Sequence, residues 1–227
     1  MAEQFVGRWV IQGLSWPLRK MICLASMRME VSVTPGEPDS AQSIDPREKI
    51  ITVSVTLTGT PRGGLGSTEV RKMDWSPLER DDFLFGLCQE QSHFVYPKKG
   101  GDEHESTERG AGVYPDVEMQ TKVDDLRAGR FLRGEINEDG SESFWDLTGR
   151  TGGVEEKGGK QDGPVWVHTF VRNLRGNGWT AEQIWGFEVI NGERRHTRRV
   201  VVANTKGQYV LARLVYKNVG EETESRK

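Results

Sequence analysis

The chain has 227 residues with 31 Lys or Arg and 34 Asp or Glu, so its net charge is only −3. A near-neutral balance argues against a nucleic-acid partner held by bulk charge. The length suits one all-β domain, and a hydrophobic share of 35% beside a charged share of 29% indicates polar insertions between ordered strands.

The first elements are a strand over residues 5–12, where apolar residues alternate, and a short amphipathic helix after Ser15 and Pro17. The apolar run around this helix is too short and too charged for a membrane span. A strand over 27–33, a loop and a strand over 50–58 with a clear period of two follow.

The middle of the chain, residues 68–149, contains a further set of predicted elements. The segment 68–75 is expected to pair with the preceding strand, and 81–95 is expected to form one long strand that bends at Gly86. Between 117 and 135 the pattern allows a short helix, followed by a strand over 130–136. A further strand is expected over 141–149.

The last third has the strongest signals. Strands are predicted over 164–174, 179–190, 194–203 and 209–218, and the turns "NGE" and "NTKGQ" make two successive hairpins. In total, about ten antiparallel strands with one short N-terminal helix predict an all-β, up-and-down barrel. One domain is expected over 1–220, with flexible insertions near 35–47, 97–115 and 149–163 and a disordered tail over 221–227.

Cysteines and enzyme motifs narrow the chemistry. Cys23 and Cys88 are the only cysteines and show no CxxC or zinc-ligand spacing, so we expect free thiols, no cofactor or metal, and a reducing, cytoplasmic location. The sequence has no GxSxG, P-loop, GxGxxG or HExxH motif. An enzyme built on this chain would work without a metal or nucleotide.

Several of these residues resemble a known superfamily. The triplet Gly7-Arg8-Trp9 on the first strand, a helix after it, a meander, and Arg213 in "VLARLVYKN" resemble the calycins, meaning lipocalins and fatty-acid-binding proteins. The blocks "STEVRKMDW", "DDFLFG" and "WTAEQIWGFEVINGERRHTRRVVV" are similar to small fungal lipocalin-like proteins. The resemblance implies a lipocalin-like barrel in which Arg213 packs over Trp9.

One departure from that superfamily concerns the ligand. Fatty-acid-binding proteins end in Arg-x-Tyr with both side chains inward, whereas Arg213 and Tyr216 are three residues apart and fall on opposite faces of a strand. A fatty-acid carboxylate clamp is therefore not expected.

The strand 179–190 places Gln183, Trp185 and Phe187 on one face, which is either an aromatic core or a ligand-contacting wall. On the next strand both faces carry arginines. Residues 194–196 are expected at a solvated rim, whereas Arg198 or Arg199 should point into the barrel. The inward arginine needs a partner, either a carboxylate such as Glu69 or a ligand oxygen.

Two further strands supply polar candidates. Glu69 and Arg71 are expected to share a face with Trp75, and Gln91 is expected to share one with His93. His93 is either a general acid or base or a satisfied structural histidine.

These features support two functions, with a structural or interaction role as a third. The first is an intracellular lipocalin-like protein that binds a small, largely apolar molecule in a barrel cavity. The alternative is a cofactor-independent cyclase or isomerase, similar to pericyclases of fungal secondary metabolism, that acts on a hydrophobic polyketide or terpenoid intermediate. The candidate residues are His93, Arg198 and Glu69 for catalysis, and Trp185, Phe187, Gln183, Arg71, Gln91, Arg199, Arg213 and Trp75 for ligand binding.

Overall fold

The computed structural model describes residues 2–5, 7–13, 28–36, 50–58, 67–82, 86–97, 112–148, 166–176 and 178–218. Side chains are described mainly from Val70 onward, together with Gln4 and Phe5. The helix predicted after Ser15, most of the three predicted insertions and the tail over 221–227 lie outside these residues.

The described strands form one antiparallel sheet. They are β1 (Gly7–Gly13), β2 (Arg28–Gly36), β3 (Ile50–Thr58), β4 (Ser67–Lys72), β5 (Leu78–Asp82), β6 (Gly86–Val95), β7 (Trp166–Asn173), β8 (Thr180–Ile190), β9 (Glu193–Ala203) and β10 (Tyr209–Asn218). A 3-10 turn, η1 (Ala2–Phe5), precedes them. Their order is β4-β3-β2-β1-β10-β9-β8-β7-β6-β5, so the predicted mostly-β, antiparallel architecture is confirmed.

The predicted closed barrel is wrong, because the strand order has two ends, β4 and β5. Among the described residues, the chain just after β4 meets β6 at an isolated bridge between Asp74 and His93. The backbone N–H of Trp75 also donates to the carbonyl oxygen of Ser92 at 2.9 Å. The sheet therefore curves until its two ends approach each other, without a continuous ladder between them.

The segment 81–95 is not one bent strand. β5 ends at Asp82, β6 begins at Gly86, and the two pair antiparallel with Asp82 opposite Gly86. Gly86 has φ of 71°, a left-handed conformation that glycine adopts without steric cost. The glycine therefore lies where the chain reverses, and not at a bend within one strand.

The segment 112–148 forms a layer on one side of the sheet. Its helix α2 (Leu126–Leu132) starts at Asp125, whose side chain accepts the N–H of Arg127 at 2.8 Å. The strand predicted over 130–136 is wrong, because its first three residues belong to this helix. The strand predicted over 141–149 is also wrong, since its described part contains only a bridge between Glu142 and Ile136.

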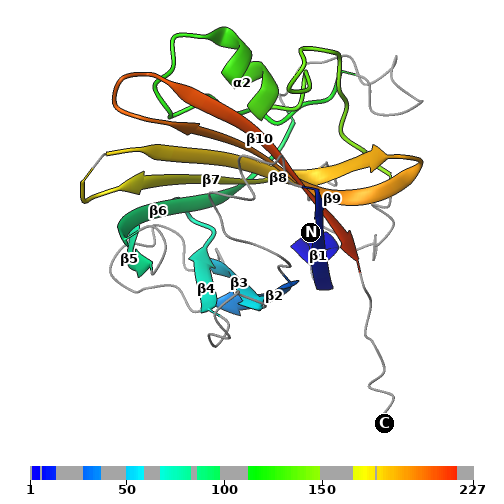
Figure 1. Cartoon of the computed structure of the whole chain (residues 1–227). Helices are drawn as coiled ribbons and strands as arrows, with labels where there is room; N and C mark the ends of the chain where they lie inside the picture. Colours follow the sequence, from blue (N-terminus) through cyan, green and yellow to red (C-terminus); the bar gives the residue numbers. More distant parts are fainter. Residues whose placement is uncertain are drawn as a thin grey trace.

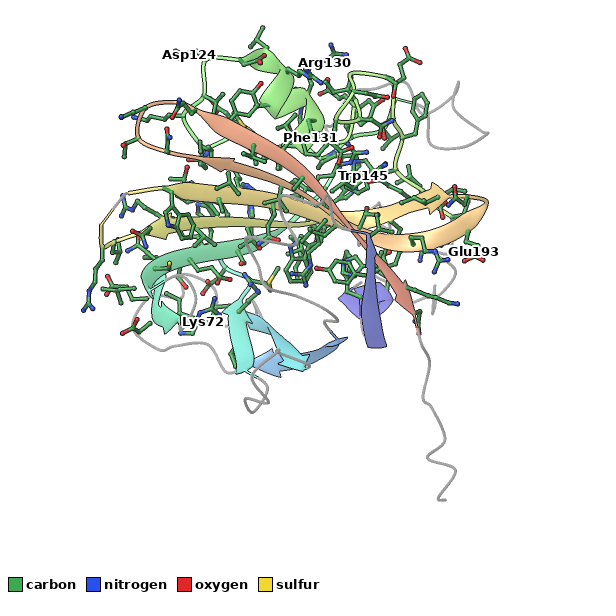
Figure 2. All side chains as sticks on the ribbon, in the orientation of Figure 1. Lys72, Asp124, Arg130, Phe131, Trp145 and Glu193 are labelled. Carbon is green, nitrogen blue, oxygen red and sulfur yellow. The ribbon has the colours of Figure 1, made fainter. Side chains whose placement is uncertain are left out.

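Apolar residues pack on both faces of β8. Figure 1 shows α2 on one side of β8–β10 and β2–β4 on the other side. We call the face toward α2 the outer face and the opposite face the inner face. Figure 2 shows Phe131 and Trp145 on the side of the sheet that faces α2. They pack there with Trp166 and Ile184, whereas Trp185 belongs to the inner cluster. None of the described helices combines the length and apolar character needed to cross a bilayer.

Candidate functional site on the inner face

The inner face of β8 carries the aromatic residues predicted to face inward. Trp185 is fully buried and Phe187 is 3% exposed, and both belong to the cluster that contains Phe5 and Tyr216. The indole N–H of Trp185 donates to Oε1 of Gln183 at 3.1 Å, so these two side chains share the face. The predicted alternation of β8 is confirmed.

Arg198 is the β9 arginine that points to the inner face. Arg198 lies directly opposite Trp185 in the β8–β9 register, and its guanidinium carbon is 3.6 Å from the indole centroid. It is also 5.4 Å from the ring of Tyr216. Arg198 is 7% exposed, so a charged group is held against aromatic rings away from bulk water.

A second arginine reaches the same indole from another part of the sheet. Arg71 on β4 is 5% exposed, and its guanidinium carbon is 5.3 Å from the centroid of Trp185. Arg71 forms an ion pair with Glu90 on β6, and Arg80 lies 3.5 Å from the other oxygen of Glu90. Glu90 therefore lies between two guanidinium groups, one from β4 and one from β5.

His196 lies deep in the inner face and not at a solvated rim, so the prediction for this residue is wrong. It is fully buried, its ring is stacked on that of Tyr216 with the centroids 5.3 Å apart, and it lies tilted against Phe187 with the centroids 5.6 Å apart. The β8–β9 pairing extends past it to the turn at 191–192, which places it opposite Phe187. Burial, and then the charges of Arg198 and Arg194, hold the pKa of His196 well below its usual value.

Arg199 points to the outer face and is paired internally. Its Nε donates to Glu188 Oε1 at 2.9 Å and its Nη2 to Oε2 at 3.1 Å. Its Nη1 donates to the carbonyl oxygens of Ile136 at 2.6 Å and Phe131 at 3.3 Å, and its Nη2 to Ser143 Oγ at 2.6 Å. Arg199, predicted as a ligand contact, is therefore a structural cation that ties the sheet to the layer around α2.

Arg213 shares this outer-face network. Its Nη1 donates to Glu188 Oε2 at 3.1 Å and to Asn137 Oδ1 at 3.0 Å. Trp9, its expected cation–π partner, lies opposite Asn218 in the β1–β10 register, five residues away along β10. Arg213 and the inward Tyr216 are on opposite faces, as their spacing predicts.

The other predicted residues fall in two places. Gln91 and His93 share a face, as predicted, but it is the outer one: Gln91 Nε2 donates to the carbonyl oxygen of Trp75 at 2.9 Å, and His93 bonds to His168. Trp75 does not share the face of Arg71, because the strand ends at Lys72 and Trp75 has φ of 62°. The predicted catalytic set therefore does not assemble, since His93 and Arg198 occupy opposite faces.

The side chain of Glu69 lies outside the described part of the structure. In its place, sequence reasoning missed Glu90 as the carboxylate beside Arg71. Alternation along β6 offered no signal, because Cys88, Glu90 and Ser92 on one face and Gln89 and Gln91 on the other are equally mixed.

Within the described ranges, no group of three or more His, Cys, Asp or Glu side chains is arranged to hold a metal ion. Comparisons of the chain with protein-family models, with curated proteins and with solved structures found no match.

Proposed function

We propose that the protein binds a small, largely apolar molecule with an anionic oxygen function on the inner face of its sheet, beside Trp185. One observation carries the proposal: two buried guanidinium groups, Arg198 and Arg71, lie against the same indole. Aromatic rings give an apolar ligand its contact area, and guanidinium groups give its oxygen charge-assisted hydrogen bonds.

The two guanidinium groups beside Trp185 favour an anionic ligand oxygen over a cation. The described carboxylate there, Glu90, is shared by Arg71 and Arg80, and His196 is held in its neutral form. The guanidinium group of Arg198 carries several N–H donors and a positive charge, so it would attract a carboxylate or enolate oxygen placed beside Trp185. A ligand amine would be repelled there.

The experiment compares a conjugated polyene fatty acid with its methyl ester. Both fluoresce when they enter an apolar site and accept energy from nearby tryptophans, Trp185 among them, so a titration gives both dissociation constants. We expect the acid to bind more tightly than the ester. In Arg198→Met the dissociation constant of the acid should rise about 10- to 100-fold, because the acid loses a charge-assisted hydrogen bond. The dissociation constant of the ester should change little.

Arg172→Met is the matched control, because Arg172 lies on the neighbouring β7, is exposed and bonds to Gln89. It should bind the acid as the wild type does. Circular dichroism and urea unfolding would show that both variants are folded. Equal affinity for acid and ester, an unchanged acid affinity in Arg198→Met, or no saturable binding of either probe would each contradict the proposal.

A further inference from the structure

On the outer face, three ionisable side chains from three neighbouring strands form a hydrogen-bonded row. His93 Nε2 on β6 lies 2.9 Å from His168 Nδ1 on β7, and His168 Nε2 lies 2.8 Å from Glu182 Oε1 on β8. Glu182 is fully buried, His168 is 2% exposed, and His93 is partly exposed. This hydrogen-bonded row therefore runs from buried Glu182 toward solvent and ends at His93.

Glu182 anchors the buried end. Its Oε2 accepts the backbone N–H of Thr121 at 2.6 Å and that of Gln120 at 2.8 Å, and its Oε1 accepts the latter at 3.0 Å as well. With its oxygens turned to backbone donors, the carboxylate acts as an acceptor toward His168. The Nε2 of His168 therefore carries the hydrogen of that bond.

The donor role of His168 Nε2 also fixes which atom donates in the hydrogen bond between His168 and His93. A neutral imidazole has one donor and one acceptor nitrogen, so His168 Nδ1 accepts and His93 Nε2 donates. The lone pair of His93 is then on Nδ1, for which the described residues provide no hydrogen-bond donor. Burial and the neighbouring His168 lower the pKa of His93 to about 4, so this lone pair is available at neutral pH.

Trp75 covers both histidines in a strained conformation. Its ring centroid is 4.3 Å from that of His93 and 4.8 Å from that of His168, and its φ is 62°. A bulky residue in this region is a genuine outlier and costs about 1 kcal/mol or more.

Hydrogen bonds hold the strained segment in place. Asp74 Oδ1 accepts the N–H and hydroxyl of Ser76 at 2.9 and 2.6 Å, while Ser92 and Gln91 bind the N–H and carbonyl of Trp75. Strain that persists because its surroundings enforce it is a feature of functional sites. Here its effect is to bring a flat aromatic ring next to His93.

We propose that His93 is a general base that moves a proton within a small β,γ-unsaturated carbonyl compound seated beside Trp75. Its Nδ1 takes a proton from the carbon next to the carbonyl, an N–H bond replaces the C–H bond, and the electron pair passes into the conjugated system as a dienolate. The imidazolium then returns the proton to the far carbon of that system. The product is an isomer, and no oxidant, reductant or cofactor takes part.

In this reaction His168 and Glu182 are positioning residues, because they fix the tautomer and orientation of His93 without touching the substrate. The site is on the opposite face of the sheet from the ligand site proposed above, and it does not depend on it. Either proposal can fail while the other holds.

The test uses a nitrobenzisoxazole, a flat aromatic carbon acid whose ring opens to a coloured nitrophenolate when a base removes one proton. We expect turnover above that of free imidazole at equal concentration. In His93→Gln, which keeps a donor for His168 but has no base, the rate should fall at least about a hundredfold. Gln89→Ala, on the same face of β6, is the matched control and should leave the rate unchanged.

A second readout separates positioning from folding. Nitrogen-15 spectra of the histidine rings should show a protonated Nε2 and an unprotonated Nδ1 for His93, and Glu182→Gln should mix the tautomers, with partial recovery in Glu182→Asp. In His168→Gln the midpoint of the pH–rate profile should rise from about 4, because one cause of the low pKa is removed.

Each of several results would overturn the proposal. These are turnover no faster than with free imidazole, an unchanged rate in His93→Gln, or a wild-type spectrum in which Nδ1 of His93 carries the hydrogen. If Glu182→Gln does not fold, the wild-type spectrum and the rate of His93→Gln still decide the matter.

Discussion

Arg198 and Arg199 are neighbours in sequence, yet they lie on opposite faces of β9 in different chemical surroundings. Arg199 is fully buried and bonds to a carboxylate, a hydroxyl and two backbone carbonyls. Arg198 is held against the faces of Trp185 and Tyr216. Oxygen acceptors therefore surround Arg199, whereas the contacts of Arg198 include the faces of two aromatic rings, so neighbouring arginines on one strand lie in different chemical surroundings.

The largest predicted effect is on the outer face. Glu188→Gln removes the charge that Arg199 and Arg213 share and should lower the free energy of unfolding by about 3–5 kcal/mol, because it leaves buried guanidinium charge uncompensated. Urea unfolding followed by circular dichroism measures the change. Glu193→Gln is the control: this carboxylate is 62% exposed and pairs with Arg195 at the surface, so we expect less than about 1 kcal/mol. Equal losses in the two variants would remove the contrast between the faces.

A somewhat smaller effect is expected where the outer layer touches the sheet. A Cβ at Gly186 would lie 2.6 Å from two ring carbons of Trp145 and 2.8 Å from Trp166 Cδ1. Gly186→Ala should therefore destabilise the protein by about 1–3 kcal/mol through overpacking. Gly129→Ala, in α2, meets only the far end of Arg133 at 3.4 Å and should instead stabilise by up to about 1 kcal/mol. Thermal unfolding should show a lower melting temperature for Gly186→Ala and a higher one for Gly129→Ala than for the wild type. An unchanged melting temperature in Gly186→Ala would mean that Trp145 and Trp166 are loosely packed against β8.

A third prediction concerns the inner face. Arg198→Met should lower the free energy of unfolding by less than Arg199→Met does, because methionine keeps an apolar contact with the indole that Arg198 covers. Arg199→Met, the same substitution one residue along, should lose about 3–5 kcal/mol, because it breaks the buried pair with Glu188. Similar losses in urea unfolding would show that Arg198 is as structural as Arg199.

The smallest effect at neutral pH is expected for His196→Phe, since phenylalanine suits the aromatic surroundings of this residue. In acid the two proteins should diverge. The pKa of His196 is depressed in the folded state, so the unfolded chain binds its proton first as pH falls below the ordinary value of 6.5. The contribution of His196 to the free energy of unfolding is therefore fully present above about pH 6.5 and is lost progressively as the pH falls below this value.

His93 contributes to the same loss, between 6.5 and its folded pKa of about 4. Unfolding in urea at about pH 7.5 and about pH 5.5 should show a smaller decrease for His196→Phe than for the wild type. An identical decrease in both proteins would exclude His196 as a cause.

The sequence predicted the sheet best where alternation and turn chemistry agree. Along 179–218 the period of two is clear, and the turn has Asn191 at φ of 53° and Gly192 at 78°, the left-handed pair that a two-residue hairpin needs. The inward placement of Trp185 and Phe187 followed from this pattern. What alternation could not tell was whether Arg198 or Arg199 faced inward, because both faces of β9 carry charge.

The outer layer escaped prediction for a physical reason. Its residues, such as Trp145 and Ile136, are buried by contacts with distant strands and not by a local period. Trp145 fits because Gly186 has no side chain, and Trp75 reaches His93 because its backbone leaves the extended conformation. Contacts of this kind depend on tertiary packing, which a local pattern does not encode.

Arg199 also ties the end of α2 to β9. Its guanidinium binds the carbonyl oxygen of Phe131 in the last turn of α2 and that of Ile136, four residues beyond the helix. The helix cannot detach without exposing a buried charge on the strand beneath it. Backbone amides of α2 and of the middle of β9 should therefore exchange with deuterated water in a single cooperative opening, despite the long stretch of chain between them.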